Sequence, residues 1–347
     1  MGARRSFFDH LHPGRVRLRT LKPTTTWGLG VACVTCMVVL GLTGLSLLPY
    51  YQASEQTAYE RIVHISTALR YGGLIRDLHF FAANALVVLS WLHLARVFLT
   101  GGYRGRRLNW LYGLGLLLVV LVANYTGYLL PWDQTAYWAA RVGSQLLGSI
   151  PVAGPTARTL LVGGRDIGPD TLPRAFALHV GVVPLALGLL GSLHLWRVRK
   201  DGGLASPARG GETLPASPWL YRAEAAVALT SLGVLLLLAM TGRAPLSARA
   251  DPFHPPNPAK APWYFVGVQE MVSHSATLGG VVAPILLALF LVLAPFLDRS
   301  HSPGGVWFER DRRALHWTFL LALLVQAGFI VVGQWMRGEN WAFRVPF

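Results

Sequence analysis

Long apolar runs, separated by basic or aromatic connections, divide this chain of 347 residues into seven segments. Each run is about 20 residues long, the length that an α-helix needs to cross the hydrocarbon core of a bilayer. Hydrophobic residues make up 53% of the chain and charged residues only 14%, whereas soluble proteins carry roughly 25% charged residues. The pattern therefore predicts an all-α integral membrane protein. The predicted spans are residues 27–48, 75–99, 109–130, 174–196, 222–242, 279–297 and 314–335.

The connections between these spans differ in composition. Residues 201–218 are rich in Gly, Pro, Ala and Ser, which predicts a linker between two parts of the chain. We therefore expect a four-helix N-terminal domain at 1–200 and a three-helix C-terminal domain at 219–347. The long connections 131–173 and 243–278 contain Trp, Tyr and Pro, and we expect them to fold as short helices at the membrane surface.

Positive charge is distributed unevenly between the two sides of the predicted membrane protein. The net charge is +15, and 19 of the 31 Lys and Arg residues lie in the N-terminal segment and the alternate connections that share its side. The positive-inside rule then places the N-terminus and the linker in the cytoplasm. We expect a multi-pass protein of a bacterial cytoplasmic membrane. The arginines occur in loops, without a basic helix that also carries aromatic residues, so we expect no nucleic-acid partner.

Four histidines lie inside the predicted second and fourth spans. His79 and His93 are fourteen residues apart, which in an α-helix gives about 21 Å of rise and a return to within about 40° of the same face. His179 and His194 are fifteen apart, about 22 Å of rise and about 60° of rotation. Both spans run in the same direction under the expected orientation, so His79 should lie level with His179 and His93 with His194.

Two facing imidazole pairs, one above the other, predict two bis-histidine metal sites. Neutral imidazole is a good ligand for iron, and polar groups inside a membrane are costly and usually functional. Two histidine ligands leave no open position for oxygen, so such haem sites transfer electrons rather than activate small molecules. The alternative is that all four histidines are structural and only align by chance.

Glycines repeat at the same period on the neighbouring spans. Gly30 and Gly44 are fourteen residues apart on the first span, and Gly113 and Gly127 are fourteen apart on the third. Glycine lets the backbone approach a flat porphyrin, although small residues also allow close helix packing without a cofactor. Haem propionates need cations, and three arginines near span ends are candidates, although membrane anchoring would also explain them: Arg76, Arg96 and Arg174.

With the stretches GYLLPWDQTAYW at 127–138 and WYF at 263–265, the four-histidine pattern resembles cytochrome b of the quinol-oxidising cytochrome bc complexes. The resemblance covers nearly the whole chain. The fifteen-residue gap and the seven spans resemble cytochrome b6 fused to its three-helix subunit IV through residues 201–218. This resemblance implies that the first four helices form a dihaem four-helix bundle.

The resemblance also implies a function. We expect the dihaem core subunit of a quinol–cytochrome c reductase type complex, which carries electrons between an outer quinol-oxidising site and an inner quinone-reducing site and translocates protons by a Q cycle. Its cofactors would be two haem b groups, with quinone and quinol exchanged with the membrane pool. Its partners would be a Rieske iron–sulfur protein and a c-type cytochrome or equivalent acceptor, around a homodimer of this chain. The alternative is a dihaem membrane anchor that exchanges electrons between quinone and a different enzyme subunit.

The resemblance assigns residues to both quinone sites. The outer site would contain proline and aromatic residues from two separate outer connections, namely Pro131, Trp132, Tyr137 and Tyr264. The inner site would contain the charged residues just past His194, namely Arg199, Lys200 and Asp201. A positive-inside anchor explains the two basic residues equally well.

Two positions depart from the pattern of the resembling family. Some b6-type relatives attach a third haem through a cysteine, but this chain has Gly28 at that position, and Cys33 and Cys36 are more than a helical turn further along. We therefore expect no covalently bound haem. The family's outer-site motif Pro-Glu-Trp-Tyr reads here with Pro262 in place of the glutamate, so the expected proton acceptor is missing.

Glu270 is the nearest downstream carboxylate and our candidate for that acceptor. It follows Trp263 by seven residues, which in a helix places both within about 20° of one face. Burial among aromatic residues would raise the pKa of Glu270 toward neutrality, as a general base requires. The competing interpretation is an ion pair, for instance with Lys260, and less favoured bases are Asp251 and His254.

Overall fold

The structure is a computed structural model that describes residues 12–204, 212–301 and 304–344. Within these residues, seven helices are long and apolar enough to cross a membrane. The predicted spans are therefore confirmed, with ends that differ by at most six residues. The seven segments are Leu29–Tyr50, Gly72–Leu99, Arg107–Leu129, Thr171–Lys200, Ala216–Thr241, Leu278–Leu297 and Arg310–Trp335.

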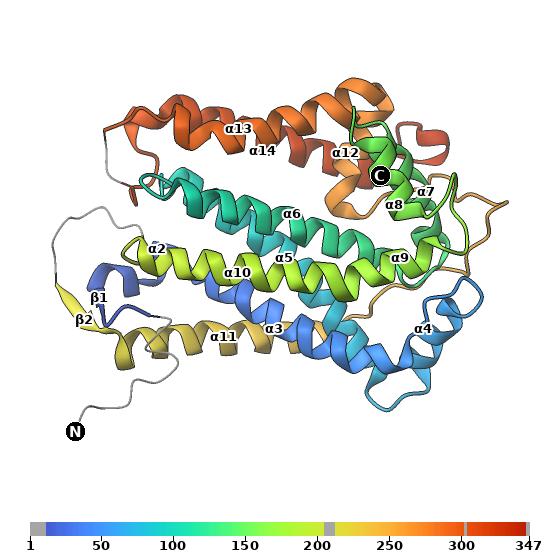
Figure 1. The fold of residues 1–347 in the computed structure, drawn as a ribbon, viewed down its shortest axis with the longest axis horizontal. Coiled ribbons are helices and arrows are strands. Elements are labelled where there is room, and N and C mark those ends of the chain that lie inside the picture. Colours follow the sequence, from blue (N-terminus) through green and yellow to red (C-terminus); the bar gives the residue numbers. More distant parts are fainter. Residues whose placement is uncertain (1–11, 205–211, 302–303, 345–347) are drawn as a thin grey trace.

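The first four of these segments form a four-helix bundle, as predicted. Helix α3 packs on α5, α5 packs on α6, and α6 packs on α10 (Figure 1). The fourth segment is composite, because a π-helical turn joins its two α-helical parts. The bounds are α3 (Leu29–Leu47) with the 3₁₀ turn η2 (Leu48–Tyr50), α5 (Gly72–Leu99), α6 (Arg107–Leu129), and α9 (Thr171–Ala177), η3 (Leu178–Val182) and α10 (Val183–Lys200).

The three C-terminal segments lie on opposite sides of this bundle. Helix α11 packs against α3 and α5, whereas α13 contacts α6, and Figure 1 shows α11 on one side with α13 and α14 on the other. The three C-terminal segments therefore flank the bundle on two sides. The bounds are α11 (Ala216–Thr241), the π-helical turn η4 (Leu278–Val282) with α13 (Ala283–Leu297), and the 3₁₀ turn η5 (Arg310–Arg312) with α14 (Arg313–Trp335).

Shorter elements gather at the two ends of the bundle (Figure 1). One end carries α4 (Ala58–Thr67), α7 (Gln134–Gly148), α8 (Gly154–Val162), α12 (Trp263–His274) and the 3₁₀ turn η6 (Glu339–Trp341). The expectation of short helices in both long connections is thus confirmed. The other end carries β1 (Arg15–Arg17), the 3₁₀ turn η1 (Leu18–Leu21), α2 (Pro23–Thr26) and β2 (Thr213–Pro215).

The predicted linker contributes to this second end. Strand β2, which follows the linker's central part, pairs antiparallel with β1 in the register Arg15–Pro215 and Arg17–Thr213. Residues 205–211 of the linker lie outside the described residues. The pairing ties the start of the chain to the start of α11.

Apolar side chains join the C-terminal helices to the bundle. Phe98 of α5 stacks on Phe319 of α14 with 4.3 Å between ring centroids. The Trp110 indole N–H of α6 donates to the Leu291 carbonyl of α13 at 2.8 Å. These contacts fix α13 and α14 against the bundle, whereas α10 leaves large apolar side chains such as Leu185 exposed, as a lipid-facing helix does.

Candidate functional site

The four histidines meet as two pairs inside the bundle. His79 of α5 faces His179 of the π turn with 6.2 Å between ring centroids and 67° between ring planes. His93 of α5 faces His194 of α10 at 6.4 Å and 80°. We name these the outer pair and the inner pair, after the predicted orientation. The structure thus brings together the histidines that the sequence spacing paired.

The π turn explains how unequal gaps along two helices give level pairs. A continuous α-helix would rotate His194 about 60° away from His179 over fifteen residues. The turn at Leu178–Val182 is wound with i→i+5 hydrogen bonds and therefore holds one additional residue. Pro184 follows at the start of α10 and has no N–H to donate to the Val180 carbonyl, which favours the wider turn. Fifteen residues here rotate the chain about as far as fourteen do in α5.

Hydrogen bonds orient three of the four rings. Thr43 uses its hydroxyl hydrogen on the Val39 carbonyl at 2.7 Å, so its oxygen accepts from Nδ1–H of His79 at 2.8 Å. Bonded in this way, Nδ1 carries the proton and Nε2 keeps its lone pair free for a metal. The tautomer of this ring follows from its neighbours.

Two further rings are assigned in the same manner. Thr126 donates to Val122 and accepts from Nδ1–H of His179 at 3.2 Å, with the Ala123 carbonyl at 3.1 Å as a second acceptor. His194 donates through Nδ1 to the Asn109 carbonyl at 3.2 Å. For His93, the described residues supply no such partner.

Each predicted glycine faces one histidine ring. A Cβ atom built on Gly44 would lie 3.4 Å from Cε1 of His79, and the corresponding distances are 3.6 Å from Gly30 to His93 and 3.5 Å from Gly113 to His194. At Gly127 the Cβ would lie only 2.6 Å from Cε1 of His179, which is a clash. The glycines of α3 thus leave room for the α5 rings, and those of α6 leave room for the rings of the fourth segment.

The donor set fits an iron porphyrin. Two imidazoles that bind one ion from opposite sides through nitrogens at about 2.0 Å, with centroids roughly 1.1 Å behind those nitrogens, have centroids about 6.2 Å apart. Both observed separations lie within about 0.2 Å of that value. The described residues contain no cluster of three or more His, Cys, Asp or Glu that would favour a different metal centre. The described residues therefore offer a metal pairs of facing imidazoles and not a multidentate protein cage.

The three candidate arginines lie near the ends of this bundle. Arg76 donates to the carbonyls of Ala244 and Pro245 at 3.0 and 2.7 Å, and Arg96 donates to the Thr25 carbonyl at 2.8 Å. Arg174 donates to the Leu160 carbonyl at 3.2 Å. Their part in binding propionates stays a prediction, because backbone carbonyls already use part of each guanidinium.

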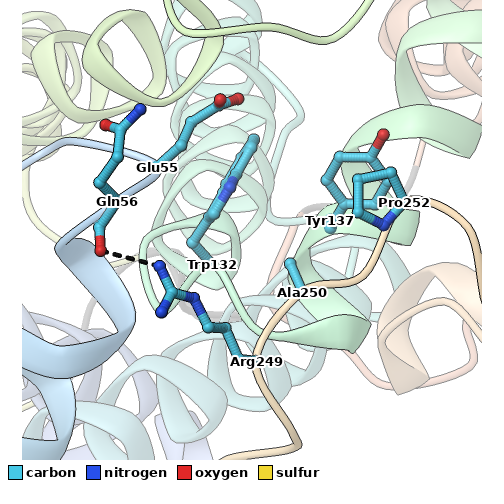
Figure 2. Close-up of a pocket in the computed structure, with 7 residues that line it drawn as sticks. All are labelled: Glu55, Gln56, Trp132, Tyr137, Arg249, Ala250 and Pro252. Carbon is cyan, nitrogen blue, oxygen red and sulfur yellow. Dashed lines mark hydrogen bonds between the residues drawn. The ribbon is translucent and has the colours of Figure 1, made fainter.

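The outer aromatic residues divide into two groups. Trp132 and Tyr137 line a pocket of about 240 Å³ together with residues of two other connections: Glu55, Gln56, Arg249, Ala250 and Pro252 (Figure 2). Asp133 caps α7 by accepting from the Ala136 N–H at 2.9 Å, which holds the start of this helix at the pocket. Tyr264 does not line this pocket. It packs beside Phe265 on α12, while Trp263 donates to Asn84 at 2.6 Å.

The prediction that burial raises the pKa of Glu270 toward neutrality is wrong. Its carboxylate is fully buried and accepts from Arg337 at 2.5 to 3.1 Å, from the Trp341 indole at 2.9 Å and from His274 at 3.1 Å. Burial alone would raise the pKa of Glu270, but the hydrogen bonds and positive charge of Arg337 outweigh it and lower the pKa below its usual value. The ion-pair interpretation is correct, with Arg337 as partner, whereas Lys260 donates to the Gln334 carbonyl.

The candidate inner residues sit at the end of α10. Asp201 forms an ion pair with Arg197 at 3.1 Å, and Lys200 lies over the Trp196 ring at 4.9 Å. Arg106, which directly precedes α6, donates to the carbonyl of Gly203, just past the end of α10. A role of Arg199, Lys200 and Asp201 with quinone stays a prediction.

Sequence reasoning did not identify four side chains that the structure brings to the candidate sites. Thr43 and Thr126 each precede a predicted glycine by one residue, so a Thr-Gly dipeptide at the histidine level was the available signal. Glu55 and Arg337 had no comparable signal, because each lies outside the predicted spans and far along the chain from groups that it meets.

Comparison with known proteins agrees with this geometry. A family model described as "Cytochrome b/b6/petB" matches residues 19–202, and one described as "Cytochrome b(C-terminal)/b6/petD" matches residues 249–339. A solved structure titled "Hyperthermophilic respiratory Complex III" shares the fold with a TM-score of 0.79 at 24% sequence identity, over 95% of this chain and 90% of that chain. Cytochromes b bind b-type haem and act as subunits of membrane oxidoreductase complexes. The chain belongs to the cytochrome b/b6 family, with the N-terminal and C-terminal parts of that family fused in one polypeptide.

Proposed function

We propose that this chain is the dihaem cytochrome b subunit of a quinol oxidoreductase and carries electrons across a bacterial cytoplasmic membrane. The geometry of the two histidine pairs supports this most directly. In each pair the two rings face each other at the spacing expected for two imidazoles that bind one metal ion, and a glycine lies beside each ring. Their levels differ by about 21 Å of helix rise, so two sites together extend across most of the hydrocarbon core.

The residues of the chain have distinct parts in this proposal. His79 and His179 hold one haem b, and His93 and His194 hold the other. Bound between them, the haems supply reversible one-electron iron chemistry. Thr43 and Thr126 keep the outer rings in the Nδ1–H tautomer, so that Nε2 binds iron. Arg76, Arg96 and Arg174 would pair with the propionates, and the apolar helices exclude water from the electron path.

Two quinone sites complete the proposed cycle. Quinol from the membrane pool is oxidised at the outer end, near Trp132, Tyr137 and Tyr264. One electron passes to a Rieske iron–sulfur protein and onward to a c-type cytochrome or equivalent acceptor, and the other passes through the outer and inner pairs. A quinone is reduced near Arg199, Lys200 and Asp201. The N-terminus lies in the cytoplasm, and the chain works as a homodimer within the larger complex.

Haem content and its location test this proposal. The purified protein should release two haems per chain into acidic acetone and show b-type spectra by the pyridine haemochrome assay. His93→Leu should remove only the inner haem, and His79→Leu only the outer haem. One haem per chain, haem that resists extraction, or a His93→Leu variant that keeps both haem signals would contradict the assignment.

Turnover separates the proposed function from the dihaem-anchor alternative. Membranes that contain the complex should transfer electrons from a quinol to a c-type cytochrome and lose this activity when the Rieske protein is deleted. Full activity without any Rieske protein would favour the anchor alternative.

A further inference from the structure

The pocket beside Trp132 has room for an aromatic head group such as that of a quinol. It is open on one side and offers about 240 Å³, whereas an apolar cavity of about 150 Å³ already binds benzene. Trp132 and Tyr137 pack edge to face inside it at 5.8 Å and offer flat surfaces to an aromatic ring. Figure 2 shows Glu55 and Gln56 on one side of the pocket, and Tyr137 and Pro252 on the other.

Most carboxylates at this end of the molecule are already engaged. Glu270 is held by Arg337 and Trp341. Asp77 accepts from Arg243 at 2.9 Å and from the Ala244 N–H at 2.8 Å. Both carboxylates are therefore already occupied by specific hydrogen-bond donors.

Asp133, Asp251 and Glu60 are engaged as well. Asp133 accepts from the Ser247 N–H at 2.8 Å in addition to capping α7. Asp251 is bonded to His254 at 2.7 Å, and Glu60 forms an ion pair with Arg249 at 3.1 Å. Each of these three anions has a specific partner outside the pocket or at its rim.

Glu55 differs from all of these groups. Within the part of the chain that the structure describes, its carboxylate has no hydrogen bond and no ion pair, although it lines the pocket. Arg249 lines the same pocket, but its guanidinium donates to Glu60 and to the Gln56 carbonyl at 2.9 Å. Burial raises the pKa of Glu55 above its usual value. A carboxylate with these properties can accept a proton, and its raised pKa lies closer to the neutral working pH that a general base requires.

We propose that Glu55 is the proton acceptor for quinol oxidation in the outer pocket and occupies the role of the glutamate that Pro262 replaces. This inference rests on the proposed function. The quinol O–H bond breaks, and the proton forms a carboxylic acid with Glu55. One electron leaves to the iron–sulfur acceptor and one to the haem held by the outer pair. Glu55 is half-exposed, so it releases the proton to outside water and accepts the second quinol proton in a second round.

The test compares Glu55→Gln with two control variants in the full complex. We expect Glu55→Gln to lower the quinol oxidation rate at pH 7 by about 100-fold, at the low end of general-base effects. Haem content and reduction of the inner haem through the inner site should stay normal. Glu60→Gln and Asp251→Asn should keep wild-type rates, because neither side chain lines the pocket.

The pH profile distinguishes a proton acceptor from a structural carboxylate. The wild-type rate should rise with pH as Glu55 ionises, and this limb should vanish in Glu55→Gln. Glu55→Asp should retain activity, with the limb moved about half a unit to lower pH because aspartate is the stronger acid. The other charged or titratable groups that face Glu55 across the pocket are Arg249 and Tyr137, and both are unchanged in these variants.

Each remaining outcome is decisive. Wild-type turnover in Glu55→Gln, or a rate lost in Asp251→Asn instead, would overturn the role of Glu55 and leave the proposed function intact. A wild-type complex that contains both haems but never oxidises quinol would overturn the proposed function itself. If Glu55→Gln does not assemble, an unshifted pH limb in Glu55→Asp contradicts the proposal.

Discussion

The outer and inner pairs use the same ligands but are held differently. Both rings of the outer pair bond to a threonine hydroxyl, and a Cβ on Gly127 would clash with one of them. Among the residues that the structure describes, only His194 of the inner pair has a hydrogen-bond partner, which is a backbone carbonyl. Gly30 leaves ordinary van der Waals space beside His93. The outer end is therefore the more rigid of the two, and substitutions there should have the larger effects.

The rigid end also includes the connection that carries Tyr264. Glu270 and Arg337 form a buried ion pair between α12 and the segment after α14. At the inner end the corresponding pair, Arg197 and Asp201, joins two residues of the same helical turn. A pair that links distant segments constrains the fold more than one within a single turn.

The largest expected difference concerns the glycines. Gly127→Ala should displace the His179 ring and reduce haem content from two per chain to about one, because its Cβ would lie 2.6 Å from Cε1. Gly30→Ala should retain both haems, since the corresponding distance to His93 is 3.6 Å. The pyridine haemochrome assay measures both. Equal haem loss in the two variants would remove the distinction between the ends.

The next largest difference should be in the stability lost when each ion pair is broken. Arg337→Met leaves the buried Glu270 carboxylate without its main partner and should cost about 3–5 kcal/mol of stability. Arg197→Met breaks a pair within one helical turn whose arginine side chain is 24% exposed, and it should cost about 1 kcal/mol or less. Thermal unfolding of the purified protein, followed by circular dichroism, checks both. A shift for Arg197→Met as large as that for Arg337→Met would be contrary to this reasoning.

Substitution of either threonine should change the midpoint potential of the outer haem alone. Thr43→Val removes the acceptor of His79 Nδ1–H, which makes the ligand a weaker electron donor and raises the midpoint potential of the outer haem. A hydrogen bond of about 0.5–1.5 kcal/mol corresponds to roughly 20–65 mV for one electron.

A matched substitution sharpens this prediction. Thr126→Val should give a smaller increase, because the Ala123 carbonyl still accepts from His179. Redox titration of the α-bands measures both variants. A shift of the inner haem in either one would show that the two sites are not independent.

Acid stability should also distinguish Glu270. Because the pKa of Glu270 is lowered in the folded protein, its contribution is complete above the unfolded value of about 4.3 and is lost as the pH falls through the folded value. Glu270→Gln should therefore lower the unfolding temperature by a constant amount between pH 6 and 8. This difference from wild type should shrink only below about pH 4. A difference that varied across neutral pH would mean that Glu270 titrates there after all.

The sequence predicted the seven spans and the histidine pairs because both depend on periodicity along single helices. It misjudged Glu270 because the groups that bond its carboxylate are supplied by Arg337 and Trp341, and no local pattern links residues about seventy positions apart. Glu55 escaped notice for a similar reason, since its pocket is assembled from three separate connections. The predicted 60° offset of His194 assumed an unbroken α-helix, and the π turn removes it.

That π turn has a consequence for comparing relatives of different length. The same arrangement recurs at Leu278–Val282, where a π turn is again followed by proline, Pro284, at the start of α13. A wide turn of this kind absorbs an inserted residue locally, so the helix beyond it keeps its angular phase. The number of residues between two ligands can therefore change by one during evolution while both ligands keep their direction in space.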